Sequence, residues 1–418
     1  MNDAELSPEA DEPARPEATP LLVPRGGVPE LVETPAGVRA LAERLAGGEG
    51  PVAIDAERAS GFRYSARAQL VQINRAGAGI SLVDPVAVGG DLSAIGEALR
   101  GVEWVVHAAV ADLPCLDEVG MRPESLFDTE LGGRIAGFDR VSLGTMTENL
   151  LGLRLAKGHS AADWSVRPLP HDYLVYAALD VDILLELRDE VQKALSEQGK
   201  LEWAYQEFEA VRLAPPPPPR KDPWRRTSGL QKVRTRRGMA IVQALWESRD
   251  ALAREKDIAP GKLLPDRAIV AAGTALPKTL QELLEIEGFT RRNVIRHRQR
   301  WFAAVQQAHQ LPERALPRKT PPIDPAAGPS RSMGKDNDVA DRYALARAVV
   351  LEVSEHLAIP PENLIPPAAV RSLAWTPPAP ITVLSVARQL EQYGARSWQV
   401  AHLEAPLAGA LAAYEPRG

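Results

Sequence analysis

The chain has 418 residues, 45% of them apolar and 25% charged, with a net charge of −6, which is typical of an ordinary soluble protein of two to four domains. A single cysteine, Cys115, excludes an internal disulfide framework and fits a reducing cytosol. No apolar run approaches the roughly 20 residues that cross a bilayer, and the acidic, proline-rich N-terminus is unlike a presequence. We therefore expect a cytoplasmic protein with no membrane partner.

The first part of the chain predicts a disordered tail followed by an α/β domain. Residues 1–28 contain six acidic residues and five prolines without apolar periodicity, so we expect them to be disordered. Residues 29–213 carry strand patterns at 51–58, 68–75, 79–85 and 103–109, a helical pattern at 92–100 and a long helical pattern at 170–196. Three consecutive strands followed by alternating helix and strand favour a mixed sheet with helices on its faces.

The rest of the chain predicts two helical domains joined by linkers. A proline-rich linker spans 214–223, a helical block spans 224–311, a second linker spans 312–337, and a second helical block spans 338–416. Residues 220–311 hold 19 Lys/Arg and 9 Asp/Glu, which is the pattern of a domain that binds a polyanion, although a solvated basic surface has the same composition. The last block has more acidic than basic residues.

The two helical blocks share a short motif at a fixed spacing. Pro260-x-x-Leu263-Leu264-Pro265 recurs as Pro361-x-x-Leu364-Ile365-Pro366, an offset of 101 residues that continues through the next apolar positions. Two copies are too few for a solenoid, so the repeat predicts tandem small domains.

Four carboxylates lie in or beside apolar segments of the α/β domain, where an uncompensated charge is costly. Asp55 and Glu57 are two residues apart on a predicted strand and therefore share one face. Asp112 follows an apolar segment and could equally cap the next helix. Tyr176 and Asp180 share one face of a helix through their i, i+4 spacing. Hard divalent cations would compensate all four carboxylates.

Taken in order, these motifs resemble the DEDDy class of exonucleases, and the ribonuclease D family in particular. The D-x-E pair, the mid-domain Asp112 and the Y-x-x-x-D helix match the three exonuclease motifs, and Phe127-Asp128-Thr129 and Trp164-Ser165-x-Arg167-Pro168-Leu169 match their flanks. The resemblance implies a ribonuclease H-like α/β exonuclease domain followed by two all-α HRDC-like domains, the second of them degenerate. The stretch between Glu57 and Gln69 contains a longer run of small and basic residues than the family leads us to expect.

The resemblance also implies a mechanism. A 3′-5′ exoribonuclease would use two Mg²⁺ or Mn²⁺ ions held by Asp55, Glu57, Asp112 and Asp180, with Tyr176 orienting the attacking water. The products would be nucleoside 5′-monophosphates, and the substrate would be the single-stranded 3′ end of an RNA such as a tRNA precursor. No phosphate-binding loop occurs, so we expect no nucleotide cofactor.

Contacts to nucleic acid are expected from aromatic and basic residues in both parts of the chain. The predicted set is Trp164, Arg167, Arg234, Arg236, Arg237, Arg292 and Arg296. A core tryptophan and a structural arginine are equally open for the first two. Three alternatives remain open at this point: a DNA 3′-5′ exonuclease acting in repair, a non-catalytic RNA-binding protein, and an accessory scaffold for a helicase.

Overall fold

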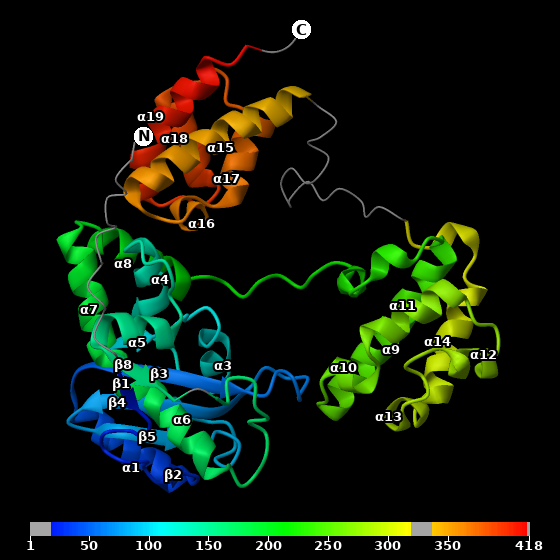
Figure 1. Cartoon of the computed structure of the whole chain (residues 1–418), viewed down its shortest axis with the longest axis horizontal. Coiled ribbons are helices and arrows are strands. Elements are labelled where there is room, and N and C mark those ends of the chain that lie inside the picture. The colour runs from blue at the N-terminus through cyan, green and yellow to red at the C-terminus, as the bar shows by residue number, and fades with distance from the viewer. Residues whose placement is uncertain (1–17, 157, 319–336, 416–418) are drawn as a thin grey trace, which may run out of the picture.

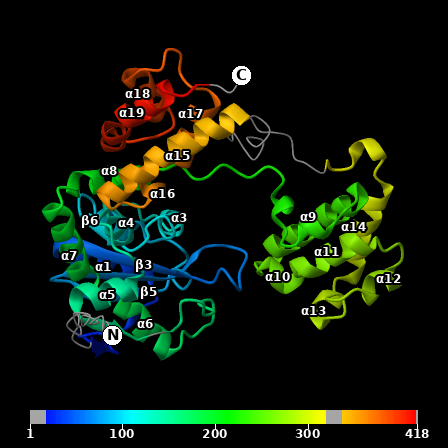
Figure 2. The ribbon, with the colours of Figure 1, turned by 45° about the horizontal axis from the view of Figure 1, so that its top comes forward.

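The computed structural model describes residues 18–156, 158–318 and 337–415, which form one α/β domain and two helical domains. Figure 1 shows the second helical domain against the α/β domain, and the first helical domain at the end of an extended linker, where the loop between β3 and β4 reaches it. Figure 2 shows the same separation from a second direction. The α/β domain contains the predicted carboxylates, so its sheet decides how they meet.

A mixed six-stranded sheet forms the centre of the α/β domain. Its strands, in spatial order, are β2 (Leu31–Val32), β5 (Gly79–Val83), β4 (Ala68–Ala76), β3 (Glu49–Arg58), β6 (Glu103–Val106) and β7 (Ser125–Asp128). The consecutive strands β3, β4 and β5 pair antiparallel, whereas β6 and β7 add in parallel on the other side of β3. The mixed sheet expected from the sequence is therefore confirmed.

Helices cover both faces of this sheet because the strands alternate buried apolar residues toward each side. Leu70 and Leu82 pack with Ala177 of α6 (His171–Asp182), whereas neighbouring residues of the same strands pack with Leu41 of α1 (Pro35–Ala46). The remaining helices of the domain are α2 (Ser93–Ala98), α3 (Leu113–Glu118), α4 (Thr129–Ile135), α5 (Leu143–Leu151), α7 (Leu184–Glu197) and α8 (Leu201–Arg212). The sheet thus has α6 on the face that carries Asp55.

The structure corrects the sequence at three places. Residues 18–28 do not belong to a disordered tail, because β1 (Thr19–Leu21) pairs in parallel with β8 (Leu153–Leu155); residues 1–17 lie outside the described residues. The strands β7 and β8 occur where only helical structure was expected. The helix expected over 170–196 is two helices, α6 and α7, which meet at Ile183.

The two helical domains repeat the same order of elements. The first contains α9 (Arg236–Lys256), α10 (Pro260–Leu263), α11 (Asp266–Ala275), α12 (Leu280–Glu285), α13 (Arg292–Ile295) and α14 (Arg298–Gln310), with short 3-10 helices at Pro223–Arg226, Leu230–Lys232 and Glu313–Ala315. The second contains α15 (Asn337–Leu357), α16 (Pro361–Leu364), α17 (Pro367–Trp375), α18 (Val383–Gln392) and α19 (Ser397–Ala412). The helices α9, α10 and α11 begin 101 residues before α15, α16 and α17, as the sequence motif indicates.

The second helical domain packs closely on the α/β domain. The apolar cores of the two domains form one continuous cluster. Trp203 of α8 stacks on Trp398 of α19 at 5.1 Å between ring centroids, and Glu207 forms an ion pair with Arg396. Buried Lys200 donates to the carbonyl oxygens of Ile135 and Leu357, one in each domain. These contacts join the two domains into one unit. In the part of the chain that the structure describes, no helix is both long and apolar enough to span a membrane.

Candidate active site

Asp55 and Glu57 lie near the end of the central strand β3. Their spacing places both carboxylates on the face covered by α6, and Asp55 pairs in the sheet with Gln72 of β4. The Gln72 side-chain amide donates to the Asp55 carboxylate at 3.3 Å. The alternation predicted from the sequence therefore brings these two carboxylates to one site.

Tyr176 and Asp180 reach the same site from α6, which packs across β3, β4 and β5. One turn of helix separates them, so the phenol and the Asp180 carboxylate lie on the same face of α6 and line the same pocket. Carboxylate oxygens of Asp55, Glu57 and Asp180 all lie within 4.8 Å of one another. Hard oxygen ligands at this spacing suit a divalent cation, so the three residues form a candidate metal site.

Asp112 approaches from the opposite side, on the segment between β6 and α3. It stands at the N-cap position of α3 but makes no capping hydrogen bond, so the capping alternative is not what the structure has. Its carboxylate instead forms an ion pair with Arg58 at 3.0 Å and lines the same pocket as Asp55. Arg58 also donates to the carbonyl oxygen of Ala111 at 2.8 Å. Asp112 thus borders the candidate metal site with an arginine as its present partner.

The electrostatics of the site favour a bound cation. Burial, strengthened by repulsion among the neighbouring carboxylates, raises the pKa of Glu57 to about 9 and that of Asp112 to about 8. Burial likewise raises the pKa values of Asp55 and Asp180. Together with Tyr176 and His107 the four acids line a pocket of about 250 Å³. Carboxylates held this close are stabilised in their charged form by a divalent ion, which agrees with the chemistry of the donor set.

Two other groups in the pocket are unsuited to act as strong bases. Burial raises the pKa of the Tyr176 phenol well above its usual value, so the hydroxyl keeps its proton at neutral pH. Burial lowers the pKa of His107 to about 4, so its ring is neutral, with Nδ1 2.9 Å from the Thr129 hydroxyl. Both side chains can therefore orient a water molecule through hydrogen bonds without carrying charge.

Trp164 is a structural support for the tyrosine. It is 0% exposed, its ring lies 6.2 Å from that of Tyr176 between centroids, and its indole N–H donates to the His159 carbonyl oxygen at 3.1 Å. His159 in turn meets Tyr176 edge to face at 5.8 Å. A ring with no exposed face has no surface on which a base could stack, so the structure contradicts the RNA contact expected of Trp164.

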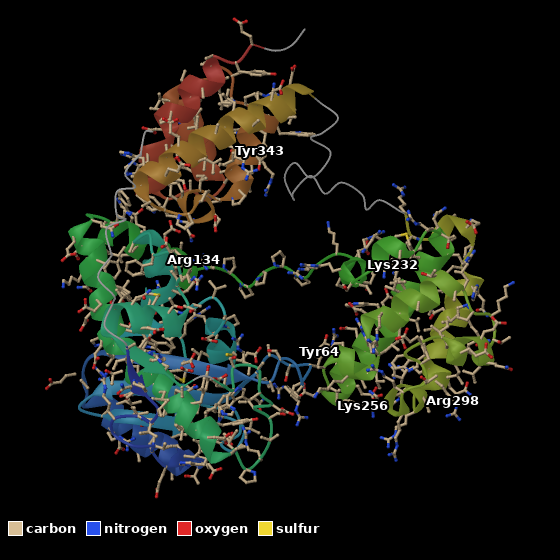
Figure 3. All side chains as sticks on the ribbon, in the orientation of Figure 1. Tyr64, Arg134, Lys232, Lys256, Arg298 and Tyr343 are labelled. Atoms are coloured by element: carbon tan, nitrogen blue, oxygen red, sulfur yellow. The ribbon has the colours of Figure 1, made fainter. Side chains whose placement is uncertain are left out.

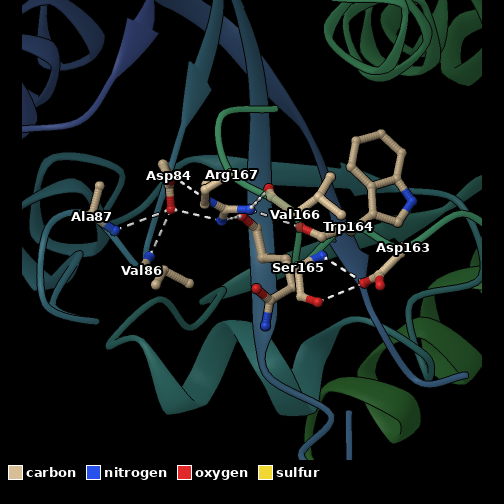
Figure 4. A network of polar contacts seen from close by, with 9 residues as sticks. Asp84, Val86, Ala87, Asp163, Trp164, Ser165, Val166 and Arg167 are labelled. Atoms are coloured by element: carbon tan, nitrogen blue, oxygen red, sulfur yellow. Dashed lines mark hydrogen bonds and ion pairs between the residues drawn. The ribbon is translucent and has the colours of Figure 1, made fainter. Parts of the chain in front are cut away.

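Arg167 is likewise engaged inside the protein. Its guanidinium binds the fully buried Asp84 at 2.6 and 3.0 Å and donates to the carbonyl oxygens of Gln69, Trp164 and Val166, as Figure 4 shows in part. Asp84 also accepts from the backbone N–H groups of Val86 and Ala87. These bonds tie the segment that carries Trp164 to the end of β5, so Arg167 positions that segment and is not a free RNA contact.

The predicted arginines of the first helical domain divide into two groups. Arg236 and Arg237 of α9 donate to carbonyl oxygens between Ala308 and Pro317, so they close the domain, and their RNA contact stays a prediction. Arg234, Arg292 and Arg296 are exposed. The latter three remain available for the nucleic-acid contacts predicted from the sequence.

Some residues of the site escaped sequence reasoning. Arg58 follows Glu57 directly and was visible as a charge beside the D-x-E pair, but nothing in the sequence pairs it with Asp112. Gln72 and His107 lie in predicted strands, where a single polar residue is common and does not by itself indicate a functional role. Cys115, expected in the core, is 2% exposed, and burial raises the pKa of its thiol to about 12.

Comparison with known proteins agrees with the fold and the site. Family models described as a 3′-5′ exonuclease, an HRDC domain and a 3′ to 5′ exonuclease C-terminal domain match residues 29–196, 239–305 and 329–411. The mixed sheet, the acidic cluster and the matches to these models define a 3′-5′ exonuclease domain followed by an HRDC domain. The chain belongs to the ribonuclease D family, and it is a 3′-5′ exoribonuclease. The second helical domain, expected to be HRDC-like, matches a model of a different description.

Relatives cover most of the chain. Ribonuclease D of Acidiphilium cryptum is 32% identical over 63% of this chain and 67% of that protein, and ribonuclease D of Gluconacetobacter diazotrophicus is 31% identical over 70% and 75%. A crystal structure of a protein from Bifidobacterium adolescentis is 37% identical, covers 94% of this chain and 100% of that one, and superimposes with a TM-score of 0.83. The likeness thus includes the helical domains as well as the catalytic one.

Proposed function

We propose that this exoribonuclease shortens single-stranded RNA 3′ ends one nucleotide at a time by two-metal-ion hydrolysis, releasing nucleoside 5′-monophosphates. The observation that carries the proposal is the convergence of Asp55, Glu57 and Asp180 within 4.8 Å, with Tyr176 and Asp112 lining the same pocket. Precursors of tRNA or other stable RNAs are the proposed substrates, since these are RNAs with 3′ extensions to remove.

The four carboxylates have separate parts in holding Mg²⁺ or Mn²⁺. Asp55, Glu57 and Asp180, whose carboxylate oxygens lie within 4.8 Å of one another, would hold one ion, and Asp55 with Asp112 in the same pocket would hold a second. Asp112 is paired with Arg58 in this structure and would have to release that arginine to bind an ion. When bound, the ions would supply Lewis-acid stabilisation of the scissile phosphate and acidify the attacking water.

Tyr176 orients the attacking water by hydrogen bonding, with its own position set by Asp180, Trp164 and His159. A phenol that keeps its proton donates a hydrogen bond to the water oxygen, and this bond fixes the direction from which the water attacks the phosphate. The pocket of about 250 Å³ admits a chain end. A base pair has to open before a 3′ terminus can enter such a site, so single-stranded ends are favoured.

The exposed arginines of the HRDC domain supply affinity for the RNA backbone. Arg234, Arg292 and Arg296 belong to a segment, residues 220–311, that carries ten more basic than acidic residues. Contacts of this kind bind phosphates without reading sequence, which suits an enzyme that removes every nucleotide in turn.

A product assay tests this function directly. The protein is incubated with 5′-labelled single-stranded RNA and matched DNA in Mg²⁺, Mn²⁺ or chelator, beside Asp55→Asn and the control Asp189→Asn, whose side chain is 72% exposed on α7. We expect a ladder of single-nucleotide steps from the 3′ end of RNA that Asp189→Asn retains and Asp55→Asn or chelator abolishes. Activity that survives Asp55→Asn overturns the assignment, and equal rates on DNA overturn the preference for RNA.

A further inference from the structure

The loop between the catalytic strand β3 and β4, residues 59–67, makes contacts that the proposed chemistry does not require. It begins directly after the metal-binding segment and projects from the α/β domain to the first helical domain, where Figure 3 labels Tyr64 near Lys256. We call residues 59–67 the docking loop.

The tip of the docking loop is fixed to the HRDC domain by side-chain and backbone contacts. The Tyr64 ring packs against the apolar core of that domain, and its hydroxyl donates to Asp250 at 3.1 Å and accepts from Arg254 at 3.2 Å. The Ser65 N–H donates to Asp257 at 2.8 Å. Hydrogen bonds to a carboxylate combined with burial of an aromatic ring are the contacts of a formed interface.

The base of the docking loop belongs to the cluster that supports the catalytic tyrosine. Phe62 packs against the buried cluster that contains Trp164 and Ala177, against which Tyr176 also packs, and its ring is covered by the Lys262 ammonium of the HRDC domain at 3.7 Å from the centroid. The Phe62 carbonyl oxygen accepts from the Ala259 N–H at 3.0 Å. Phe62 therefore contacts the Tyr176 cluster and the HRDC domain at once.

Within the described part of the chain, the hydrogen bonds and ring contacts that join the HRDC domain to the α/β domain come from the docking loop. The linker of residues 214–223 includes five consecutive prolines, is extended in Figure 1, and is largely exposed. Such a linker sets a maximum distance but not an orientation. The docking loop supplies the orientation, because it contacts the α9–α10 corner of the HRDC domain on one side and the active site on the other.

We propose that the docking loop is a positioning element that holds the HRDC domain at a fixed place beside the active site, so that RNA gripped by its arginines presents the 3′ end to the carboxylates. The inference rests on the proposed RNA grip of that domain. Fixing two binding sites in one geometry raises the effective concentration of the second, so the benefit exists only for an RNA long enough to reach both.

The test compares a short oligoribonucleotide, which reaches the active site alone, with a long single-stranded RNA. The variants are Tyr64→Ala, which removes the ring and hydroxyl contacts of Tyr64 but keeps the Ser65 backbone bond, and Tyr64→Phe, which keeps the ring but loses the hydroxyl hydrogen bonds with Asp250 and Arg254. Tyr393→Ala, with a tyrosine 40% exposed on the second helical domain, is the matched control. We expect kcat/KM of Tyr64→Ala to fall about tenfold on the long RNA and to stay within about twofold on the short one. Tyr64→Phe should be intermediate, and Tyr393→Ala unchanged.

The distribution of distances between fluorophores on the α/β and HRDC domains provides a second readout, and this distribution should be broader in Tyr64→Ala. An equal loss of kcat/KM on both substrates would place the effect in the active site, and no loss on the long RNA would remove any role for the loop; either result overturns the proposal. If Arg292→Gln with Arg296→Gln leaves RNA affinity intact, the RNA grip itself fails. If those changes weaken binding while Tyr64→Ala has no effect, the docking inference alone fails.

Discussion

At the scale of single residues, the pairing of Arg58 with Asp112 bears on the second metal position that we propose. The ion pair, 3.0 Å long, is largely shielded from solvent because the Asp112 side chain is 6% exposed. A cation entering there has to displace the guanidinium and approach it against electrostatic repulsion. Arg58 therefore competes with the ion that Asp112 is proposed to hold.

Replacing Arg58 by glutamine should tighten the weaker of two Mn²⁺ binding steps by about tenfold, or about 1.4 kcal/mol. Titration calorimetry on the protein without RNA measures this, so the result does not depend on turnover. Arg100→Gln, an exposed arginine paired with Glu97, is the control. Unchanged or weaker binding in Arg58→Gln would mean that the arginine does not compete with metal.

The raised pKa values of the site carboxylates predict how the metal-free protein responds to pH. Burial raises the pKa of Glu57 to about 9 and that of Asp112 to about 8, so the folded protein holds protons that the unfolded chain has already released. Stability without metal should consequently fall as pH rises from about 5 to about 9. Bound Mn²⁺ replaces these protons and should flatten the decline.

Melting temperatures in chelator and in Mn²⁺ across that pH range provide the measurement. Glu57→Gln removes one of the titrating groups and should reduce the slope in chelator, whereas Glu97→Gln, 64% exposed, should not. A melting temperature in chelator that climbs steadily with pH would contradict the prediction.

The residue scale also separates what sequence can and cannot predict. Asp55 with Glu57, and Tyr176 with Asp180, follow from the periods of a strand and a helix, so their side chains could be placed together from spacing alone. The burial of Trp164 and the engagement of Arg167 could not. Asp84, which binds Arg167, lies 83 residues away in the chain, and such a partner becomes visible only when the sheet is formed.

At the scale of elements, the packing of α6 on the sheet matters most because this helix carries both Tyr176 and Asp180. Its strand partners were predictable from long alternating apolar patterns. The strands β1, β7 and β8 were not, because segments of three or four residues are too short to show a period and are stabilised by the neighbours they pair with. The break at Ile183 has the same character: leucines continue at helical spacing through it.

Trp164→Phe should lower kcat by about threefold to tenfold and leave KM for RNA nearly unchanged. The phenyl ring keeps most of the packing under α6 but loses the indole hydrogen bond to His159, which loosens the seat of Tyr176. Trp375→Phe, at a tryptophan 43% exposed in the second helical domain, controls for the substitution. Steady-state kinetics distinguish this from a stacking role, since loss of base stacking would raise KM and leave kcat in place.

At the scale of the whole molecule, the two helical domains serve the α/β domain differently. The second shares its apolar core and is bound through Lys200, Glu207 and Trp203, and its charge is slightly acidic. The first is basic and reaches the α/β domain through the docking loop. Charge composition already separated a basic helical domain from a slightly acidic one, whereas the docking contacts could not be predicted from the sequence.

Replacing both Arg292 and Arg296 by glutamine should weaken the binding of every RNA sequence to the same extent. It should also lower the slope of log affinity against log salt by about 1.4, because single-stranded phosphates release about 0.7 counterion per contact. Binding titrations at several salt concentrations, with the metal chelated, measure the slope. Arg347→Gln with Arg388→Gln, both exposed on the second helical domain, makes an equal change of charge and should leave the slope in place. An unaltered slope in the first pair would remove these arginines from the RNA interface.

The repeat of 101 residues extends to the way both copies attach. In the first, Asp257 at the corner after α9 accepts from Ser65 of the docking loop. In the second copy, the equivalent residue is Ala358, which lies against Gly137: a Cβ added at Gly137 would lie 2.5 Å from the Ala358 carbonyl oxygen. The carbonyl oxygen of the preceding residue, Leu357, accepts from Lys200. Both corner residues have the same left-handed backbone, with φ of 47° and 49°. If a gene duplication created the tandem pair, both copies would have inherited the corner through which each attaches to the α/β domain, and their surface charges could then diverge.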